Sequence, residues 1–197
     1  MQAISLTRLN EYSDNCVKLA KKLSDAEGSV LYTPTWRASL DWAEKLSMTQ
    51  EDVVNLNKIS VTELMKVRDM HEEDDFKVYI CGQIGPRGDG YIAREKMSRD
   101  EAASYHATQI QAFAESGADL VSAATVNYAE EGAGITLAAK KFDMPTVIGF
   151  TVETDGSLPD GTGLSEAIEM VDSVTDNYPV HYMINCAHPT HFLHLFR

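Results

Sequence analysis

Five short apolar segments, separated by longer amphipathic stretches, are the feature that most constrains the fold of this chain. The segments contain few polar residues, which is typical of strands in a parallel sheet that is covered on both faces. We expect strands at residues 29–32, 78–82, 120–124, 146–151 and 180–185. We expect helices at residues 8–23, 49–69, 98–116, 128–142 and 165–175, and a further one at 188–195. This order predicts an α/β fold with a parallel sheet and flanking helices.

Helix-capping residues support these boundaries independently of the hydrophobic pattern. Ser98 and Glu101 have the spacing of a capping box, and Thr49 and Asp52 are a near match with aspartate in place of glutamate. Gly117 stands where the helix that begins near Ser98 is expected to end, as a glycine commonly does. Two helix starts and one helix end are therefore predicted from local chemistry.

The bulk composition predicts one domain that covers residues 1–197. Hydrophobic residues make up 44% of the chain, and no low-complexity tract is present. The 30 acidic residues exceed the 17 basic ones, which gives a formal net charge of -13. Nucleic-acid-binding proteins and proteins that bind anionic membranes carry basic patches. We therefore expect no nucleic-acid partner and no membrane partner.

The cysteines indicate a reducing compartment. Cys16, Cys81 and Cys186 lie far apart and include no CxxC pair, so they do not form a disulfide framework. The first residues lack the hydrophobic region of a signal peptide, and no apolar run is long enough to span a membrane. The sequence therefore predicts a cytoplasmic protein.

Cys186 has the most informative position of the three. It follows the apolar segment 180–185, directly after Asn185, and residues typical of a helix start follow it at once. A thiol placed there lies at the carboxyl end of a parallel strand, which is where barrels of this class carry out chemistry. A thiolate at that end can act as a nucleophile or as a zinc ligand. The alternative is that Cys186 is a small buried hydrophobic residue.

A glycine-rich segment, residues 82–90, follows the second expected strand. It lacks both the GxGxxG pattern and the lysine ending of phosphate-binding loops, so its glycines are expected to permit tight turns and close backbone approach. Arg87 in this segment could pair with a substrate carboxylate. The alternative is a solvated surface arginine.

Histidines and tryptophans give weaker signals. His188, His191 and His194 suggest metal ligands, but three-residue steps rotate around a helix, so capping or surface roles are favoured. Trp36 and Trp42 are expected either to line a cleft or to pack in the core.

Taken together, five segments resemble the homocysteine S-methyltransferase family. They are residues 31–39 (LYTPTWRAS), 82–90 (GQIGPRGDG), 113–120 (FAESGADL), 150–153 (FTVE) and 184–186 (INC). Each lies at an expected strand end or at a helix-to-strand junction. They occur in the family's order from residue 29 to the end of the sequence.

The resemblance implies a (β/α)8 TIM-type barrel in which three cysteines bind zinc. Zinc would lower the pKa of the homocysteine thiol, and the thiolate would accept a methyl group from a sulfonium or betaine-type donor, a step of methionine biosynthesis. The family's first zinc cysteine follows its sixth strand in an Asn-Cys pair, which matches Asn185 and Cys186. Cys186 is thus the implied metal ligand. The implied substrate-binding residues are Thr35, Gly82, Gly85, Thr125 and Asn185.

Three departures from the family pattern bear on activity. The other two zinc cysteines, an adjacent pair in the family, have no counterpart here, because Cys16 and Cys81 do not match their positions. Ala124 stands where the family usually has a glutamate that contacts the amino group of the substrate. The Asp-Gly-Gly turn that follows the family's first strand is absent.

These departures predict an incomplete barrel. A full barrel needs roughly 250 residues, and the five expected strands would correspond to strands two to six. Open sheet edges favour self-association, so we expect a homo-oligomer that covers them. The first interpretation is a zinc-dependent, homocysteine S-methyltransferase-like protein with a thiol substrate and a methyl donor. The alternatives are a non-catalytic binding or interaction protein on this fold, and a transferase or lyase with another substrate.

Overall fold

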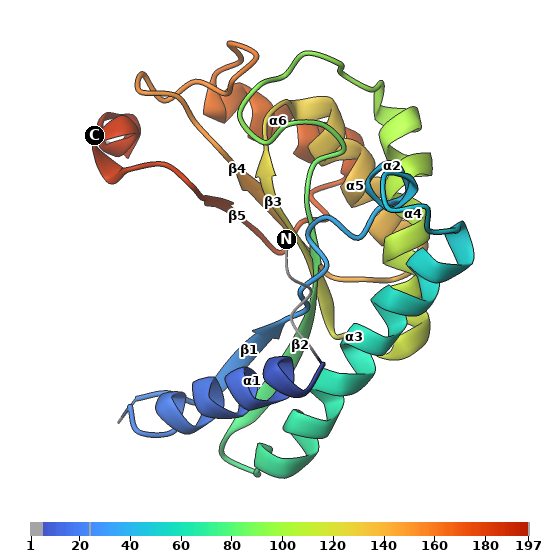
Figure 1. Cartoon of the computed structure of the whole chain (residues 1–197). Helices are drawn as coiled ribbons and strands as arrows, with labels where there is room; N and C mark the ends of the chain where they lie inside the picture. Colours follow the sequence, from blue (N-terminus) through green and yellow to red (C-terminus); the bar gives the residue numbers. More distant parts are fainter. Residues whose placement is uncertain (1–5, 24, 197) are drawn as a thin grey trace.

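The computed structural model describes residues 6–23 and 25–196, in which one five-stranded sheet curls into a half-barrel (Figure 1). The strands are β1 (Gly28–Tyr32), β2 (Lys77–Ile84), β3 (Leu120–Val126), β4 (Thr146–Phe150) and β5 (His181–Ile184). They lie in sequence order, and every neighbouring pair is parallel. The predicted α/β fold with a parallel sheet is confirmed.

Helices cover the outer side of the curled sheet (Figure 1). They are α1 (Leu6–Ala20), α2 (Leu40–Glu44), α3 (Gln50–His71), α4 (Arg99–Ser116), α5 (Ala129–Lys141) and α6 (Leu164–Thr175). Successive helices from α3 to α6 pack side by side, and α1 packs against α3 and β1. The single turn of α2 is the one helix of this set that the sequence pattern did not predict.

The predicted helix boundaries are confirmed where capping residues marked them. Both capping boxes form: Thr49 caps α3 with Asp52, and Ser98 caps α4 with Glu101. Gly117 ends α4 with a φ of 85°, in the left-handed region that glycine adopts without strain.

The predicted helix at residues 188–195 is wrong. The segment instead forms two short 3₁₀ helices, Pro189–His191 and Leu193–Phe196. None of the residues in either helix is buried. Short helices in water depend on packing of an apolar face for their stability, and this segment has little such packing. His188 caps the first 3₁₀ helix, in agreement with the predicted capping role of a histidine.

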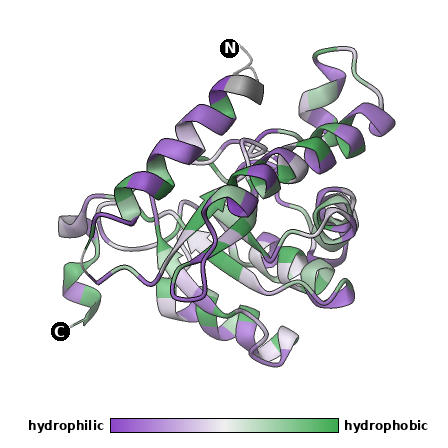
Figure 2. Ribbon diagram, turned by 90° about the horizontal axis from the view of Figure 1, so that it is seen from below, coloured by the Kyte–Doolittle hydropathy of each residue, from purple (hydrophilic) through white to green (hydrophobic). Residues whose placement is uncertain are grey.

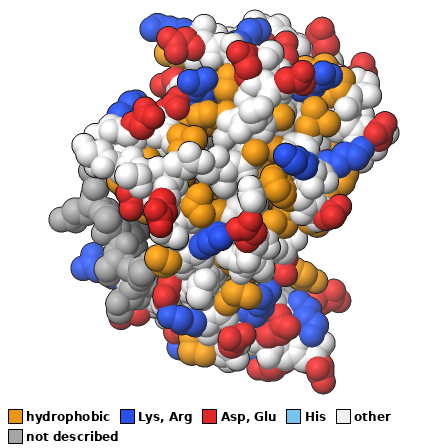
Figure 3. All heavy atoms as spheres, turned by 90° about the vertical axis from the view of Figure 1, so that its right-hand side faces the viewer, with side chains coloured by type: hydrophobic (Ala, Val, Ile, Leu, Met, Phe, Trp, Pro, Cys, Tyr) orange, Lys and Arg blue, Asp and Glu red, His pale blue; other side chains and the backbone are white. Residues whose placement is uncertain are grey.

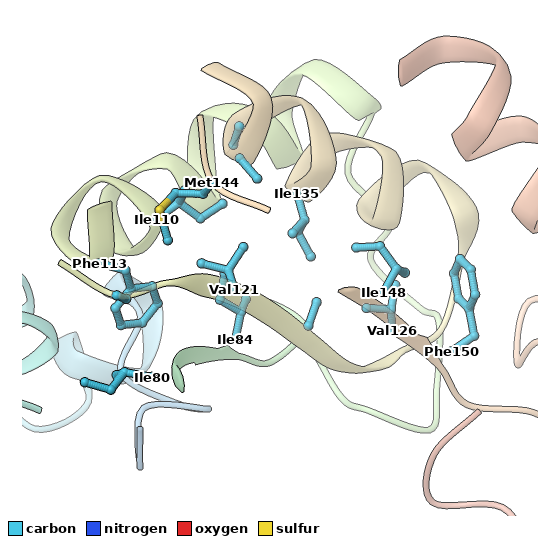
Figure 4. Packing of buried hydrophobic residues seen from close by; sticks show 14 of the residues in the cluster. Ile80, Ile84, Ile110, Phe113, Val121, Val126, Ile135, Met144, Ile148 and Phe150 are labelled. Atoms are coloured by element: carbon cyan, nitrogen blue, oxygen red, sulfur yellow. The ribbon is translucent and has the colours of Figure 1, made fainter. Parts of the chain in front are cut away.

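The core lies between the sheet and its helices. Figure 4 shows its centre, where Phe113 of α4 and Ile135 of α5 lie over Val121, Ile148 and Phe150 of the strands. All five side chains are fully buried. This packing fixes α4 and α5 over the middle of the sheet, and so sets the positions of the loops that enter them.

The inner side of the sheet is less covered than the outer side. Val30, Tyr32 and Tyr79 are 43%, 49% and 49% exposed, and they alternate with the buried residues Leu31 and Ile80. Figure 2 shows hydrophobic residues gathered on the strands at the centre of the molecule. In the described part of the chain, β1 and β5 each pair with one strand only, so both edges of the sheet are open.

The outer surface carries charges of both signs. Figure 3 shows acidic and basic side chains intermixed over this face, without a large patch of one sign. Ion pairs such as Lys58–Glu115 and Arg68–Asp119 link neighbouring elements. None of the helices in the described ranges combines the length and the hydrophobicity that crossing a bilayer requires.

Candidate functional site

The carboxyl ends of all five strands meet at one edge of the half-barrel, because the strands are parallel. The predicted site residues Thr35, Gly85 and Cys186 lie in the loops that leave these ends, and Thr125 lies near the end of β3. In barrels of this class the chemistry takes place at this face. The structure brings some of these residues together and separates others.

Thr125, Asn185 and Cys186 form a hydrogen-bonded cluster. Asn185 Oδ1 accepts from the backbone N–H of Thr125 at 2.9 Å, and Asn185 Nδ2 donates to Thr125 Oγ1 at 2.8 Å. The same Nδ2 donates to Cys186 Sγ at 3.3 Å, and Thr125 Oγ1 lies 3.7 Å from that sulfur. The amide of Asn185 therefore fixes the sulfur of Cys186 relative to β3.

The backbone of this cluster is strained at two residues. Thr125 has a φ of 65° and Cys186 a φ of 55°, in the left-handed region that β-branched residues in particular avoid. The pairing of β3 with β4 also shifts register within residues 123–126. Such conformations cost about 1–3 kcal/mol each and are concentrated at functional sites. The bonds from Asn185 hold Thr125 in this conformation.

Neighbouring side chains lower the pKa of the Cys186 thiol. The largest cause is a hydrogen-bonding interaction with the hydroxyl of Tyr91. Burial is the next largest cause and opposes it, and Asn185 and Thr125 add smaller lowering effects. The same contact raises the pKa of Tyr91. Cys186 is exposed, so the alternative of a small buried hydrophobic residue is wrong. An accessible cysteine that favours the thiolate can bind a metal or attack an electrophile.

Thr35 is placed in a buried network next to this cluster. Its side chain is fully buried, and its Oγ1 bonds to Thr33 Oγ1 at 2.6 Å and to the carbonyl of Gln83 at 2.8 Å. These bonds join the loop after β1 to β2. The predicted contact of Thr35 with a substrate stays a prediction.

Gly82 and Gly85 make room for aromatic rings. A Cβ on Gly82 would lie 2.4 Å from the ring of Phe113, and a Cβ on Gly85 would lie 2.4 Å from the backbone oxygen of Trp36. The indole Nε1 of Trp36 donates to the carbonyl of Ala124 at 3.1 Å. Both glycines thus permit close packing, and a contact with substrate stays a prediction for each of them.

Arg87 is paired with a protein carboxylate. Its Nε donates to Asp41 Oδ2 at 2.6 Å. The neighbouring Arg37 packs between two indole rings, with its guanidinium carbon 4.0 Å from the centroid of Trp36 and 4.4 Å from that of Trp42. The tryptophans therefore pack around Arg37 beside the glycine-rich loop.

The described residues do not by themselves fit a zinc ion. Within the described ranges, no three His, Cys, Asp or Glu side chains are arranged to share a metal. The match of Cys186 to a family zinc ligand stays a prediction from the sequence. Cys81 is buried inside β2, where burial raises the pKa of its thiol to about 12. His188 and His194 are bonded to nearby protein atoms. Since a zinc site needs at least three protein ligands, Cys186 alone does not provide one.

Sequence motifs missed three residues that build this region. One of them is Tyr91, whose hydroxyl lowers the pKa of the Cys186 thiol. His106 and Glu131 are each 1% exposed, and His106 Nε2 lies 2.9 Å from Glu131 Oε1. In the sequence they are single polar residues without a motif. The one available signal is that His106 and Glu131 interrupt the apolar faces of two predicted helices.

Comparison with known families identifies the chain. The sequence profile described as homocysteine S-methyltransferase matches residues 6–197. The chain belongs to this family. The resemblance carried by the five loop segments is thereby confirmed, whereas no curated protein matches the sequence.

Solved structures of a homocysteine S-methyltransferase have the same fold. The metallated form of the homocysteine methyltransferase MmuM from Escherichia coli has a TM-score of 0.78 and 18% identity, and the match covers 94% of this chain and 66% of MmuM. The oxidized form has a TM-score of 0.79 and 19% identity, with 97% and 67% covered. The chain thus spans about two thirds of MmuM, and the predicted incomplete TIM-type barrel is confirmed.

Proposed function

We propose that this homocysteine S-methyltransferase-like chain binds homocysteine at the carboxyl ends of its strands, where the thiol accepts a methyl group. The observation that carries the proposal is the exposed Cys186, whose sulfur bonds to Asn185 and Thr125 and whose pKa is lowered chiefly by Tyr91. Methyl transfer from a sulfonium or betaine-type donor would give methionine, so the reaction belongs to methionine biosynthesis. Free thiols persist in a reducing compartment, so we place the protein in the cytoplasm.

A metal would enter this proposal through Cys186. When bound, zinc supplies the positive charge that deprotonates a coordinated thiol. Because the described residues do not complete a ligand set, the further ligands have to come from residues outside them or from another chain. The residues of this chain contribute the position of one sulfur: Asn185 orients it, and Thr125 and Tyr91 favour its thiolate form.

A second candidate function is non-catalytic binding on the same fold. Two observations favour it. Within the described ranges no complete metal-ligand group is present, and Ala124 stands where the family usually has a glutamate. In this case the strand-end face would bind a small molecule or a partner without turnover.

Zinc content and homocysteine binding separate the two candidates. The protein is purified, stripped with a mild chelator, reloaded with zinc and measured by elemental analysis, and homocysteine is then titrated calorimetrically. Cys186→Ser is the test variant. Cys16→Ser is the matched control, because Cys16 is a free cysteine in α1, far in the sequence from the strand ends.

The methyltransferase proposal expects about one zinc per site, lost in Cys186→Ser and kept in Cys16→Ser, together with zinc-dependent binding of homocysteine. Transfer from S-methylmethionine or betaine would then be assayed. Absence of zinc from the reloaded wild type would contradict a zinc-dependent transferase and support the binding candidate. Equal zinc content in both variants would remove Cys186 from the metal site.

A further inference from the structure

We infer that Glu131 of α5, backed by His106 of α4, is a positioning residue that holds residues 85–97 over the strand ends. This segment, here called the 85–97 loop, connects β2 to α4 and contains neither helix nor strand. A loop of this length without secondary structure needs other attachments to keep one conformation.

Three hydrogen bonds attach the loop to residues 127–131, at the start of α5. Glu131 Oε1 accepts from the backbone N–H of Arg87 at 2.8 Å. Asn127 Nδ2 donates to the carbonyl of Asp89 at 2.7 Å. The hydroxyl of Tyr128 accepts from the backbone N–H of Met97 at 3.0 Å. Two residues near the beginning of the loop and its last residue are therefore bound to residues 127–131.

Glu131 is the centre of this arrangement. It is 1% exposed, and besides accepting from the N–H of Arg87 it bonds to His106 Nε2 at 2.9 Å. His106 is also 1% exposed, and its Nδ1 has no hydrogen-bond partner among the described residues. Because Glu131 Oε1 also accepts from the N–H of Arg87, the carboxylate is the acceptor and His106 Nε2 the donor of this bond. His106 thereby orients the carboxylate toward the loop.

Packing alone does not explain a carboxylate at this position. A buried carboxylate is unfavourable unless hydrogen bonds satisfy it, and an apolar side chain of similar volume commonly gives equal or greater stability. The donors that satisfy Glu131 come from the loop and from α4, and neither of those bonds lies within α5 itself. We therefore attribute the carboxylate at this position to its hydrogen bond with the loop.

The attachment also determines where two loop residues meet the strand ends. A Cβ on Gly90 would lie 2.8 Å from Thr125 Cγ2, so the loop backbone rests on the Thr125 side chain. Tyr91 follows directly, and its hydroxyl is the neighbour that most lowers the pKa of the Cys186 thiol. Displacement of the loop would move Tyr91 away from the sulfur. The role of the loop at a ligand site rests on the proposed function, whereas its attachment to α5 does not.

Limited proteolysis tests the attachment directly. Arg87, Arg94 and Lys96 are exposed trypsin sites in the loop. The test variant is Glu131→Ala, and Glu131→Gln is the conservative variant because it keeps an acceptor oxygen for Arg87 N–H. The matched control is Thr136→Val, since Thr136 is a buried polar residue of the same helix that bonds only to the carbonyl of Gly132. Cleavage sites are identified by mass spectrometry under native conditions.

Glu131→Ala is expected to raise the cleavage rate within the loop about 10- to 100-fold, because a hydrogen bond to a charged group is lost and cleavage follows the open population. Glu131→Gln is expected to restore most of the protection, and Thr136→Val to leave the loop protected. Should Glu131→Ala not fold, Tyr128→Phe removes the Met97 attachment and is expected to give a smaller rise. Wild-type cleavage rates, or a rise spread equally over helices and loop, would overturn the inference.

Tryptophan emission gives a second readout that a purely structural role would not change. Trp36 lies against Gly85, and Trp42 Nε1 donates to the carbonyl of Arg87 at 3.2 Å, so both indoles contact the loop. Glu131→Ala should shift the emission while Thr136→Val does not. An unchanged spectrum in Glu131→Ala would count against a positioning role. Because neither readout uses homocysteine, failure of the proposed function leaves this test intact.

Discussion

Replacing Gly82 by alanine is expected to destabilise the fold by overpacking it. Gly82 is a buried residue of β2, and a Cβ there would lie 2.4, 2.6 and 2.8 Å from three ring atoms of Phe113. The ring is fully buried, so it has no free space to move into. Insertions of this kind cost about 1–3 kcal/mol. At about 2–4 °C per kcal/mol for a domain of this size, the melting temperature should fall by about 2–12 °C.

A second substitution tests whether the Phe113 ring is the cause. Phe113→Leu by itself removes buried ring atoms and is expected to destabilise the protein. In the double variant the smaller leucine leaves room for the new methyl group, so the two costs should not add. The difference from additivity should be about 0.5–3 kcal/mol in the stabilising direction, as is found for residues in contact. Gly88→Ala is the control, because a Cβ there meets nothing within 4 Å.

Urea unfolding followed by circular dichroism measures the four variants and the wild type under the same conditions. Strictly additive costs of Gly82→Ala and Phe113→Leu would refute the steric argument. So would a Gly82→Ala variant with wild-type stability. If that variant also lost homocysteine binding, Gly82 would have the ligand-binding role that the sequence predicted, and its role in packing against Phe113 would be secondary.

Two further predictions concern the strand ends and the open edges. Tyr91→Phe removes the largest cause of the lowered pKa of Cys186, so the pKa should rise and alkylation by iodoacetamide at pH 7 should slow in a Cys16→Ser background. The rate at high pH should stay unchanged, and an unaltered pH profile would argue against the Tyr91 contact. The open edges at β1 and β5 predict self-association, which sedimentation velocity checks over a concentration series. A monomer at every concentration would contradict it, and Val30→Lys on β1 should weaken any association that uses that edge.

Much of the fold was predictable because its signals are local. The strands from β1 to β5 were each identified to within two residues at either end, since an apolar run in a covered parallel sheet needs no partner to be recognised. Capping chemistry gave the starts of α3 and α4 for the same reason. The segment after β5 was mispredicted because Pro189 and neighbouring residues are compatible with a helix start, while the apolar packing that would extend the helix is a tertiary property.

In the candidate site, too, the residues with local sequence signals were predicted and those defined by tertiary contacts were not. Cys186 and Asn185 were predicted because they follow a strand directly, and their position in the chain is itself the signal. Tyr91 and Glu131 were missed because their partners lie 95 and 44 positions away, and no spacing in the sequence indicates such contacts. Arg87 is exposed and pairs with Asp41, which agrees with the alternative of a surface arginine, and its contact with a substrate carboxylate stays a prediction.

Gly149 is a residue of the sequence that does indicate the candidate site. It interrupts the buried strand β4, where a glycine has no side chain to pack and commonly marks the close approach of another group. A Cβ there would lie 2.6 Å from Asn185 Oδ1 and 2.9 Å from the carbonyl oxygen of Ala123. Any larger residue would displace the amide of Asn185 and so release Thr125 from its strained backbone conformation. A glycine inside an apolar strand thus predicts a close contact with another group. Only the fold shows that this group is the side chain of Asn185, which orients Cys186.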